Sequence, residues 1–360
     1  MSPIALPSQH AAVLHGAKDL RYEDRTLWPP QQGHVQVAVL ATGLCGSDLH
    51  YYMHGRNGDF ALQAPLVLGH ESAGIVTAVG PGVKNFVTGQ RVAIEAGIMC
   101  RDCSYCKKGR YNLCKNMRFA SSAKTFPHLD GTLQDRMNHP AHVLHPLPDN
   151  CSFEQAALAE PLSVLLHASR RASFTSSSAP STVLVFGVGA IGLLACALAK
   201  SYGATRVVAI DINQARLNFA KEQGFAEQVY CLSMTDRAKT TEDQLKRARE
   251  NVGAALSAFG EPDGFDLVFE CTGAEPCIQM SIHVSLRFPS PHLCSLFPPY
   301  SPPFTFPSKT GGYNRRQSHA RRNGQSERHS SSERRGTPRS RHSRLVPVCE
   351  YLPGSPRSAC

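Results

Sequence analysis

The stretch TVLVFGVGAIG, residues 182–192, decides the fold of the second half of this 360-residue chain. A β-branched and aromatic run enters a glycine-rich turn, and a helix-like segment follows at residues 193–202. The next apolar run ends at Asp211, nineteen residues after Gly192. A strand, a glycine-rich turn, a helix and a second strand ending in an acid form the fingerprint of a dinucleotide-binding unit. The alternative is a glycine-rich turn in an unrelated strand–helix–strand unit.

The glycines and the acid of this stretch have distinct predicted roles. Gly187 permits the tight turn, Gly189 lets the backbone approach a pyrophosphate, and Gly192 allows the helix to pack closely on the strand. The N-terminus of the helix offers unpaired N–H groups to the phosphates. Asp211 can accept hydrogen bonds from ribose hydroxyls and would repel a 2′-phosphate, so we expect NAD rather than NADP.

A candidate metal site precedes this unit in the chain. The segment GHESAG, residues 69–74, brings His70 and Glu71 twenty-five residues after Cys45. A thiolate, an imidazole and a carboxylate can hold a zinc ion with one open coordination position. Zinc with an open position does chemistry, because it can bind a substrate oxygen and stabilise negative charge on it. Taken alone, a Cys and a His at this separation can equally be two unrelated residues.

Four further cysteines lie within fifteen residues, with gaps of two, two and seven. This spacing lets four thiolates surround one tetrahedral ion, and the polar and basic residues between them indicate a solvated lobe. Disulfides and free structural thiols are the alternatives. We disfavour disulfides, because the first ten residues show neither the basic start nor the apolar stretch of a signal peptide. The predicted ligands of this structural zinc are Cys100, Cys103, Cys106 and Cys114.

Two domains and a tail are predicted along the chain. Up to about residue 165, short apolar runs alternate with Gly and Pro turns, as at residues 34–40 and 90–94, which is typical of a small β-barrel-like domain. From residue 166 to 285, helices alternate with strands, which predicts an α/β fold with a doubly wound parallel sheet. The predicted strands are 183–186, 207–210, 229–232 and 265–269, and the longest predicted helix is 241–259.

The composition changes after residue 285. Residues 286–360 carry twelve Arg and one Lys against three Glu, so their net charge of +10 equals that of the whole chain. Eleven of the 25 prolines also lie there, which predicts a disordered tail. One interpretation is a basic appendage that binds nucleic acid through phosphate contacts. The other, which we favour, is a shifted reading frame or an unspliced intron, because an appendage normally follows a completed fold.

The three motifs, in this order, resemble one family: the zinc-dependent medium-chain alcohol dehydrogenases, and within it the sorbitol/xylitol (polyol) dehydrogenase branch. The resemblance spans about residues 10–283 and rests on GLCGSDLHY (43–51), GHESAG, the four-cysteine lobe, AEPLS (159–163) and GVGAIG (187–192). It implies a GroES-like β-barrel catalytic domain at 1–165 and a Rossmann NAD domain at 166–285. Two more parallel strands are expected after residue 285, so we predict a sheet truncated after its fourth strand, with the strand at 265–269 left as an unpaired edge.

The resemblance also implies roles for individual residues. Cys45, His70 and Glu71 match the catalytic zinc ligands, and Glu160 would bind that metal directly or through water. Asp48 matches the carboxylate that orients the zinc-bound imidazole. The other matches are the proton relay of Ser47 and His50, the catalytic and substrate position Glu160, the substrate positions Tyr51 and Phe119, and the coenzyme positions Gly187, Gly189, Ile191, Gly192, Asp211 and Arg216.

The implied activity is the oxidation of a polyol of the sorbitol, xylitol or L-arabinitol type to a ketose. Hydride would pass to NAD, and the alcohol proton would leave through Ser47 and His50. The resemblance implies a homo-oligomer, tetramer or dimer. Thirteen cysteines without a secretory signal or a membrane-spanning run favour the cytoplasm. The alternatives are a truncated, catalytically weak zinc protein and a nucleic-acid binder that acts through the tail.

Overall fold

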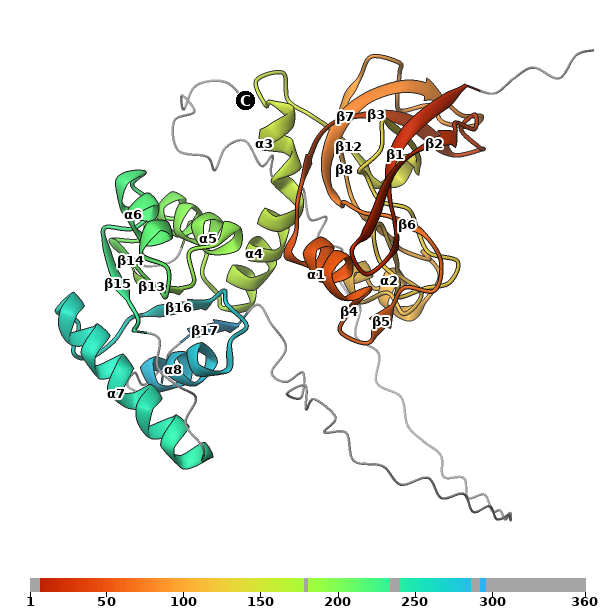
Figure 1. The fold of residues 1–360 in the computed structure, drawn as a ribbon. Coiled ribbons are helices and arrows are strands. Elements are labelled where there is room, and N and C mark those ends of the chain that lie inside the picture. The colour runs from red at the N-terminus through yellow and green to blue at the C-terminus, as the bar shows by residue number, and fades with distance from the viewer. Residues whose placement is uncertain (1–6, 178–180, 234–239, 286–291, 296–360) are drawn as a thin grey trace, which may run out of the picture. The chain divides into compact units, whose positions relative to one another are not determined.

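A computed structural model describes residues 7–177, 181–233, 240–285 and 292–295, which form two folded parts (Figure 1). The first part is built on antiparallel strands and the second on a parallel sheet. Among the described residues, no helix is long and apolar enough to cross a membrane. The disorder and nucleic-acid binding predicted for the tail concern residues that, apart from 292–295, lie outside the described part.

The N-terminal part contains a five-stranded antiparallel sheet with the order β11-β3-β7-β8-β12 and a three-stranded sheet with the order β2-β1-β6. Alternate residues of the larger sheet, among them Val35, Val37 and Val92, are buried in one cluster, because successive side chains of a strand point to opposite faces. The strands are β1 (Ser8–Gly16), β2 (Asp19–Thr26), β3 (His34–Gly43), β4 (Arg56–Asn57), β5 (Phe60–Ala61), β6 (Leu66–Val67), β7 (Glu71–Val79), β8 (Arg91–Ile94), β9 (Gly97–Ile98), β10 (Arg118–Phe119), β11 (Arg136–Pro140) and β12 (Leu144–Pro146).

The helices of this part are short. They are α1 (Gly46–His54), α2 (Ser104–Lys107), α3 (Phe153–Ala157) and the 3-10 turns η1 (Tyr111–Leu113) and η2 (Ala141–Val143). A longer helix, α4 (Ala159–Arg171), follows, and the domain boundary predicted between residues 165 and 166 falls inside it. Leu165 and Ala168 of α4 are buried in the core of the parallel sheet, so this helix already packs with the second part.

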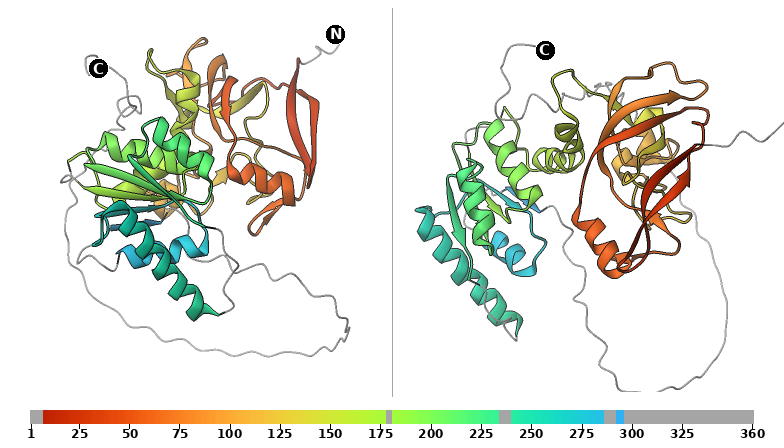
Figure 2. Two further views of the ribbon diagram at one scale, coloured as in Figure 1. Left: turned by 60° about the vertical axis from the view of Figure 1, so that its left-hand side comes forward. Right: turned by 45° about the horizontal axis from the view of Figure 1, so that its top comes forward.

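The second part is a five-stranded parallel sheet with the order β15-β14-β13-β16-β17 and helices on both faces (Figure 2). Val183 and Val185 point into a core that α4, α5 and α6 cover, whereas Leu184 and Phe186 point into a core that α7 and α8 cover. Both faces are apolar, as expected for a parallel sheet with two helical layers. The elements are β13 (Thr182–Phe186), α5 (Ala190–Ser201), β14 (Arg206–Asp211), α6 (Gln214–Glu222), β15 (Gln228–Cys231), α7 (Thr241–Phe259), β16 (Leu267–Glu270), α8 (Glu275–Ser285) and β17 (His292–Ser295).

The predicted doubly wound sheet is confirmed, but its predicted truncation after the fourth strand is wrong. A fifth strand, β17, pairs in parallel with β16 from Leu267↔His292 to Glu270↔Ser295, so β16 is not an edge. The physical reason is the edge of β16, whose unpaired backbone groups are satisfied by the backbone of His292–Ser295. The connection through α8 returns the chain to the sheet as a βαβ crossover does.

The close pairing of β3 with β7 generates a prediction about stability. A Cβ atom at Gly74 of β7 would lie 1.9 Å from the backbone oxygen of Ala38 in β3. We expect Gly74→Ala to lower the free energy of unfolding by about 3 kcal/mol, because two backbones would have to separate. Urea unfolding followed by circular dichroism measures this. Gly16→Ala in β1 is the control, because its Cβ would meet nothing within 4 Å; an equal effect of both variants would contradict the prediction.

Candidate metal centres and coenzyme site

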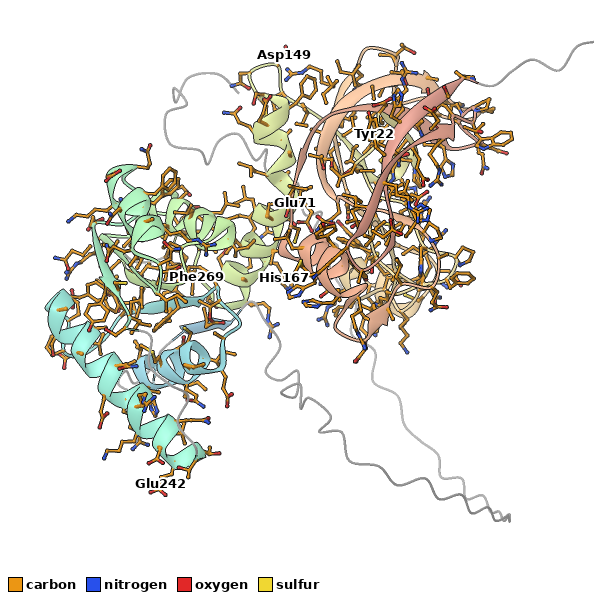
Figure 3. All side chains as sticks on the ribbon, in the orientation of Figure 1. Tyr22, Glu71, Asp149, His167, Glu242 and Phe269 are labelled. Atoms are coloured by element: carbon orange, nitrogen blue, oxygen red, sulfur yellow. The ribbon has the colours of Figure 1, made fainter. Side chains whose placement is uncertain are left out.

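Three side chains that can bind a metal meet where β3 ends and β7 begins. One donor atom each of Cys45, His70 and Glu71 lies within 4.8 Å of the others. Glu71, labelled in Figure 3, is the first residue of β7, and Cys45 is the N-cap of α1. Because the strands pair Gly43 with Glu71, the sheet register brings the two sequence segments together. Three protein ligands leave the fourth position of a tetrahedral zinc ion open, as in catalytic sites.

Gly43 leaves the space that the Glu71 carboxylate occupies. A Cβ atom at residue 43 would lie 2.2 Å from Oε2 of Glu71. No side chain larger than hydrogen can stand there while the carboxylate keeps its place in the cluster. Gly43 is therefore part of the candidate metal site, although it offers no ligand.

The Asp48 carboxylate connects the segments that carry the three ligands. Its Oδ2 accepts the backbone N–H of Cys45 at 3.1 Å, and its Oδ1 accepts that of Gly69 at 3.1 Å. Oδ1 also accepts the hydroxyl of Ser121 at 2.7 Å and lies 3.7 Å from Nδ1 of His70. Asp48 is only 3% exposed. The predicted role of Asp48, which is to orient the His70 ring, stays a prediction, and the carboxylate lies beside that ring.

The electrostatics of the cluster suit a cation. Burial raises the pKa of the Cys45 thiol, against hydrogen bonds from Ser47 that lower it. Burial also raises the pKa of Glu71 and of Glu160, and neighbouring carboxylates add to both shifts, whereas His70 lowers them. Acidic groups that lie close together in a buried place favour a divalent cation, because its charge offsets both their mutual repulsion and the cost of their desolvation. The donor set of sulfur, nitrogen and oxygen is one that zinc accepts.

The structure places most of the other predicted catalytic residues near this cluster. Ser47 lies beside Cys45 and lowers the pKa of its thiol, and His50 is exposed one turn further along α1. Phe119 of β10 packs edge-on against the His70 ring, with the ring centroids 5.4 Å apart. Glu160 is the second residue of α4. Burial raises the pKa of its carboxyl group, and the nearby His70 lowers it. These contacts bring the residues together but do not test their roles.

Tyr51, predicted to contact substrate, is buried in the structure. Its side chain is 1% exposed and packs in a core cluster with Leu14, Leu66 and Leu68. Its hydroxyl accepts the backbone N–H of Ala123 at 2.9 Å. The predicted contact of Tyr51 with substrate stays a prediction, which this buried position does not support. The helical spacing of α1 turns Tyr51 to the core and His50 to solvent.

The four-cysteine lobe forms the second candidate metal centre. The sulfur atoms of Cys100, Cys103, Cys106 and Cys114 lie within 4.8 Å of one another. The Cys103–Cys106 sulfur separation is 3.6 Å and the Cys100–Cys106 separation is 4.0 Å. Tetrahedral Zn–S bonds of about 2.3 Å require sulfurs about 3.8 Å apart, so the cluster fits zinc. Ten cysteines in the described part of the chain are free rather than joined as disulfides.

Backbone donors favour the metal-binding form of two of these thiols, whereas burial raises the pKa of Cys106 to about 12. Backbone N–H groups of Cys106 and Lys115 lower the pKa of Cys103 to about 6. Backbone hydrogen bonds, the first from Cys103, also lower the pKa of Cys100. The thiolate is the form that binds a metal.

The glycine-rich turn has the geometry that a coenzyme pyrophosphate needs. Gly187 has a φ of 85°, in the left-handed region that favours glycine. A Cβ at Gly192 would lie 1.7 Å from the backbone oxygen of Gly187, whereas a Cβ at Gly189 would meet nothing within 4 Å. Helix α5 begins at Ala190, three residues earlier than predicted, so Gly189 is its N-cap and its first N–H groups border the turn. Ile191, another predicted coenzyme residue, is partly buried and packs against the sheet core.

Asp211 ends β14 beside this turn. Its Oδ2 accepts the backbone N–H of Val188 at 2.7 Å, and its Oδ1 accepts that of Asn213 at 2.9 Å. Arg216, another predicted coenzyme residue, lies on the exposed side of α6. Its backbone N–H donates to the Oδ1 atom of Asn213. The acid therefore stands at the carboxyl end of its strand, which is where dinucleotides bind in such sheets.

Sequence reasoning missed two contributors to the metal site, Gly43 and Ser121. Both lie within or next to the quoted motifs, but neither residue type can ligate zinc. Only the strand register reveals the steric role of Gly43. Ser121 could have been suspected only from its place two residues after Phe119.

The fold and these two centres define a zinc-dependent oxidoreductase with a separate coenzyme-binding sheet. Comparison with known proteins identifies the family. Residues 31–149 match the alcohol dehydrogenase GroES-like domain, and residues 190–287 match the zinc-binding dehydrogenase domain. The chain belongs to the zinc-binding alcohol dehydrogenase family, polyol branch, and is an NAD-dependent enzyme.

Relatives and solved structures agree with this assignment. A probable D-xylulose reductase A of Aspergillus fumigatus is 42% identical over 275 residues, which cover 76% of this chain and 71% of the relative. The structure of L-idonate 5-dehydrogenase from Escherichia coli K-12 is similar with a TM-score of 0.61 and 30% identity, covering 76% of this chain and 71% of that one. A protein described as a short chain alcohol dehydrogenase from Escherichia coli CFT073, complexed with NADH, has a TM-score of 0.61 and 27% identity, covering 74% of this chain and 70% of that one.

The space beside Gly43, which the Glu71 carboxylate occupies, generates a prediction about metal content. We expect Gly43→Ala to displace the Glu71 carboxylate and to weaken zinc binding at that cluster about tenfold to a hundredfold, because one ligand loses its place. Zinc per chain after dialysis against a weak chelator should fall from two to one. Gly46→Ala in α1 is the control, because its Cβ would meet nothing within 4 Å. Retention of both zinc ions by Gly43→Ala would refute the steric role.

Proposed function

We propose that this chain interconverts a five- or six-carbon polyol and its ketose, with Cys45, His70 and Glu71 holding the catalytic zinc. The observation that carries the proposal is the convergence of the three donor groups in one cluster. The names of the relatives, among them D-xylulose reductase A of Aspergillus oryzae, favour xylitol and D-xylulose as the first pair to test. Two physical features support the coenzyme half: the open space at Gly189 and the acid at the end of β14.

When bound, zinc supplies the Lewis acidity that lowers the pKa of the substrate hydroxyl, and NAD supplies the hydride acceptor. Residues of the chain itself carry the proton away from the substrate. Ser47, beside the Cys45 thiol, receives the hydroxyl proton and passes it along α1. His50, three residues later on the same helix face, releases the proton to solvent, because it is exposed.

Glu160 and Phe119 complete the proposed substrate site. Burial raises the pKa of Glu160, and His70 lowers it, so this carboxyl group belongs to the electrostatics of the cluster. It can contact the metal or hydrogen-bond a neighbouring hydroxyl of the polyol. The ring of Phe119, packed against His70, presents an apolar wall that limits the access of water.

A direct test uses the purified full-length chain. We expect two zinc ions per chain, saturable NAD binding and NADH formation with xylitol. Glu71→Gln should lose the activity and one zinc, because a neutral amide is a poorer zinc ligand than a carboxylate. Cys196→Ser, a change at a buried cysteine away from both clusters, is the control for general destabilisation. One zinc per chain, no NAD binding and no turnover would instead identify a catalytically silent zinc protein.

The place of Asp211 generates a prediction about coenzyme choice. We expect Asp211→Asn to raise the Kd for NAD about tenfold, equivalent to about 1.4 kcal/mol. The ratio of the Kd for NADP to the Kd for NAD should become smaller. The charge that would repel a 2′-phosphate is removed, and one of two acceptor oxygens becomes a donor facing backbone N–H groups. Asp266→Asn is the matched control, because Asp266 accepts hydrogen bonds from Thr182 at the opposite, amino-terminal end of the sheet. Fluorescence titration with both coenzymes measures the change.

The assembly and the compartment remain part of the proposal. The family resemblance supports a homo-oligomer, tetramer or dimer, and light scattering on the purified chain determines which. The free cysteines of the described residues support a reducing compartment such as the cytoplasm.

A further inference from the structure

A buried serine lies behind the proposed catalytic metal site. Ser121 follows β10 and is 3% exposed. Its backbone φ is 63°, in the left-handed region where glycine is favoured and serine is uncommon. A residue held in an unfavourable backbone conformation and buried at a functional site suggests a hypothesis of function. The side chain of Ser121 is the part of this residue that a glycine would lack.

The hydroxyl of Ser121 has one acceptor, the Asp48 carboxylate. Its Oγ donates to Oδ1 of Asp48 at 2.7 Å, the shortest of the hydrogen bonds that this carboxylate accepts. Oδ1 lies 3.7 Å from Nδ1 of His70, a buried ring nitrogen that has no hydrogen-bond partner among the described residues. Ser121 therefore donates its hydrogen bond to Oδ1 of Asp48, the oxygen that faces the proposed zinc ligand His70.

The segment around Ser121 does not need this hydroxyl to hold its shape. The backbone N–H of Ser121 donates to the oxygen of Leu129 at 2.9 Å, and that of Ala120 donates to the oxygen of Ala96 at 3.0 Å. Two residues earlier, Phe119 packs against the ring of His70, the residue that faces Asp48. One segment thus contacts both the imidazole and the carboxylate that would orient it.

We propose that Ser121 is a positioning residue of the catalytic metal site, whose hydroxyl holds the Asp48 carboxylate in the orientation that fixes the His70 ring. This inference rests on the proposed function, because it requires His70 to be a zinc ligand. Without the hydroxyl, Oδ1 of Asp48 keeps only the N–H of Gly69 as a hydrogen-bond donor. The carboxylate can then rotate, and the imidazole is less restricted. Loss of such outer partners typically lowers metal affinity by about tenfold to a hundredfold.

Two variants separate positioning from folding. Ser121→Gly removes the hydroxyl and at the same time relieves the left-handed backbone, so its denaturation midpoint should equal or exceed that of the parent chain. Ser121→Ala removes the hydroxyl and keeps the strain. We expect both variants to bind zinc at the three-ligand site about tenfold to a hundredfold more weakly. Ser122→Ala is the neighbouring control, because its hydroxyl only accepts the backbone N–H of Lys124 at 3.3 Å.

The experiment uses the full-length chain, a competing chelator and cobalt. Zinc release gives the affinity, and the four-cysteine zinc in the same molecule is the internal reference. After cobalt replaces the catalytic zinc, the visible absorption bands report ligand geometry. We expect both Ser121 variants to shift these bands and Ser122→Ala not to shift them.

Two results would overturn the proposal in distinguishable ways. A two-zinc parent whose Ser121→Gly variant keeps its zinc affinity and cobalt spectrum excludes positioning by Ser121 and leaves the proposed function intact. A parent that binds zinc only at the four-cysteine lobe contradicts the proposed function itself, and the inference about Ser121 with it.

Discussion

The candidate catalytic site depends on one buried carboxylate. Asp48 accepts hydrogen bonds from the backbone of Cys45 and of Gly69 and from the side chain of Ser121. These donors come from the start of α1, the loop before β7 and the loop after β10, which are far apart in the sequence. Each of these donors restrains the carboxylate, and together they satisfy both of its buried oxygens. The two segments that carry the three proposed ligands are therefore held in place by hydrogen bonds of the protein itself.

Much of the site could be predicted because its chemistry lies in local spacing. The cysteine spacing and the GHESAG segment identify donor atoms, and the positions of their side chains follow from a helix N-cap and a strand start. Gly43 could not be predicted, because its role depends on which residue of β7 faces it across the sheet. Ser121 could not be predicted either, because the partner of a serine hydroxyl follows from tertiary structure alone.

Two features of the structure differ from the simplest interpretation of the sequence, for opposite reasons. Tyr51 was assigned from a motif position, but a motif does not state which helix face is buried, and the packing against Leu14 and Leu66 decides it. Strand β17 was missed because its four residues carry no strand pattern of their own and lie in a segment whose composition is typical of disorder. An open edge at β16 offers unpaired backbone groups, and even a short neighbouring run can satisfy them.

The parallel sheet has a consequence for how this chain can change in evolution. Consecutive residues of β13 fill different cores, with Val183 and Val185 on one side and Leu184 and Phe186 on the other. Insertion or deletion of a single codon within that strand would exchange the two sets, and both helical layers would then face side chains of the wrong volume. Length variation among descendants of this sequence is thus confined to the connecting loops, while the strands can change only by substitution.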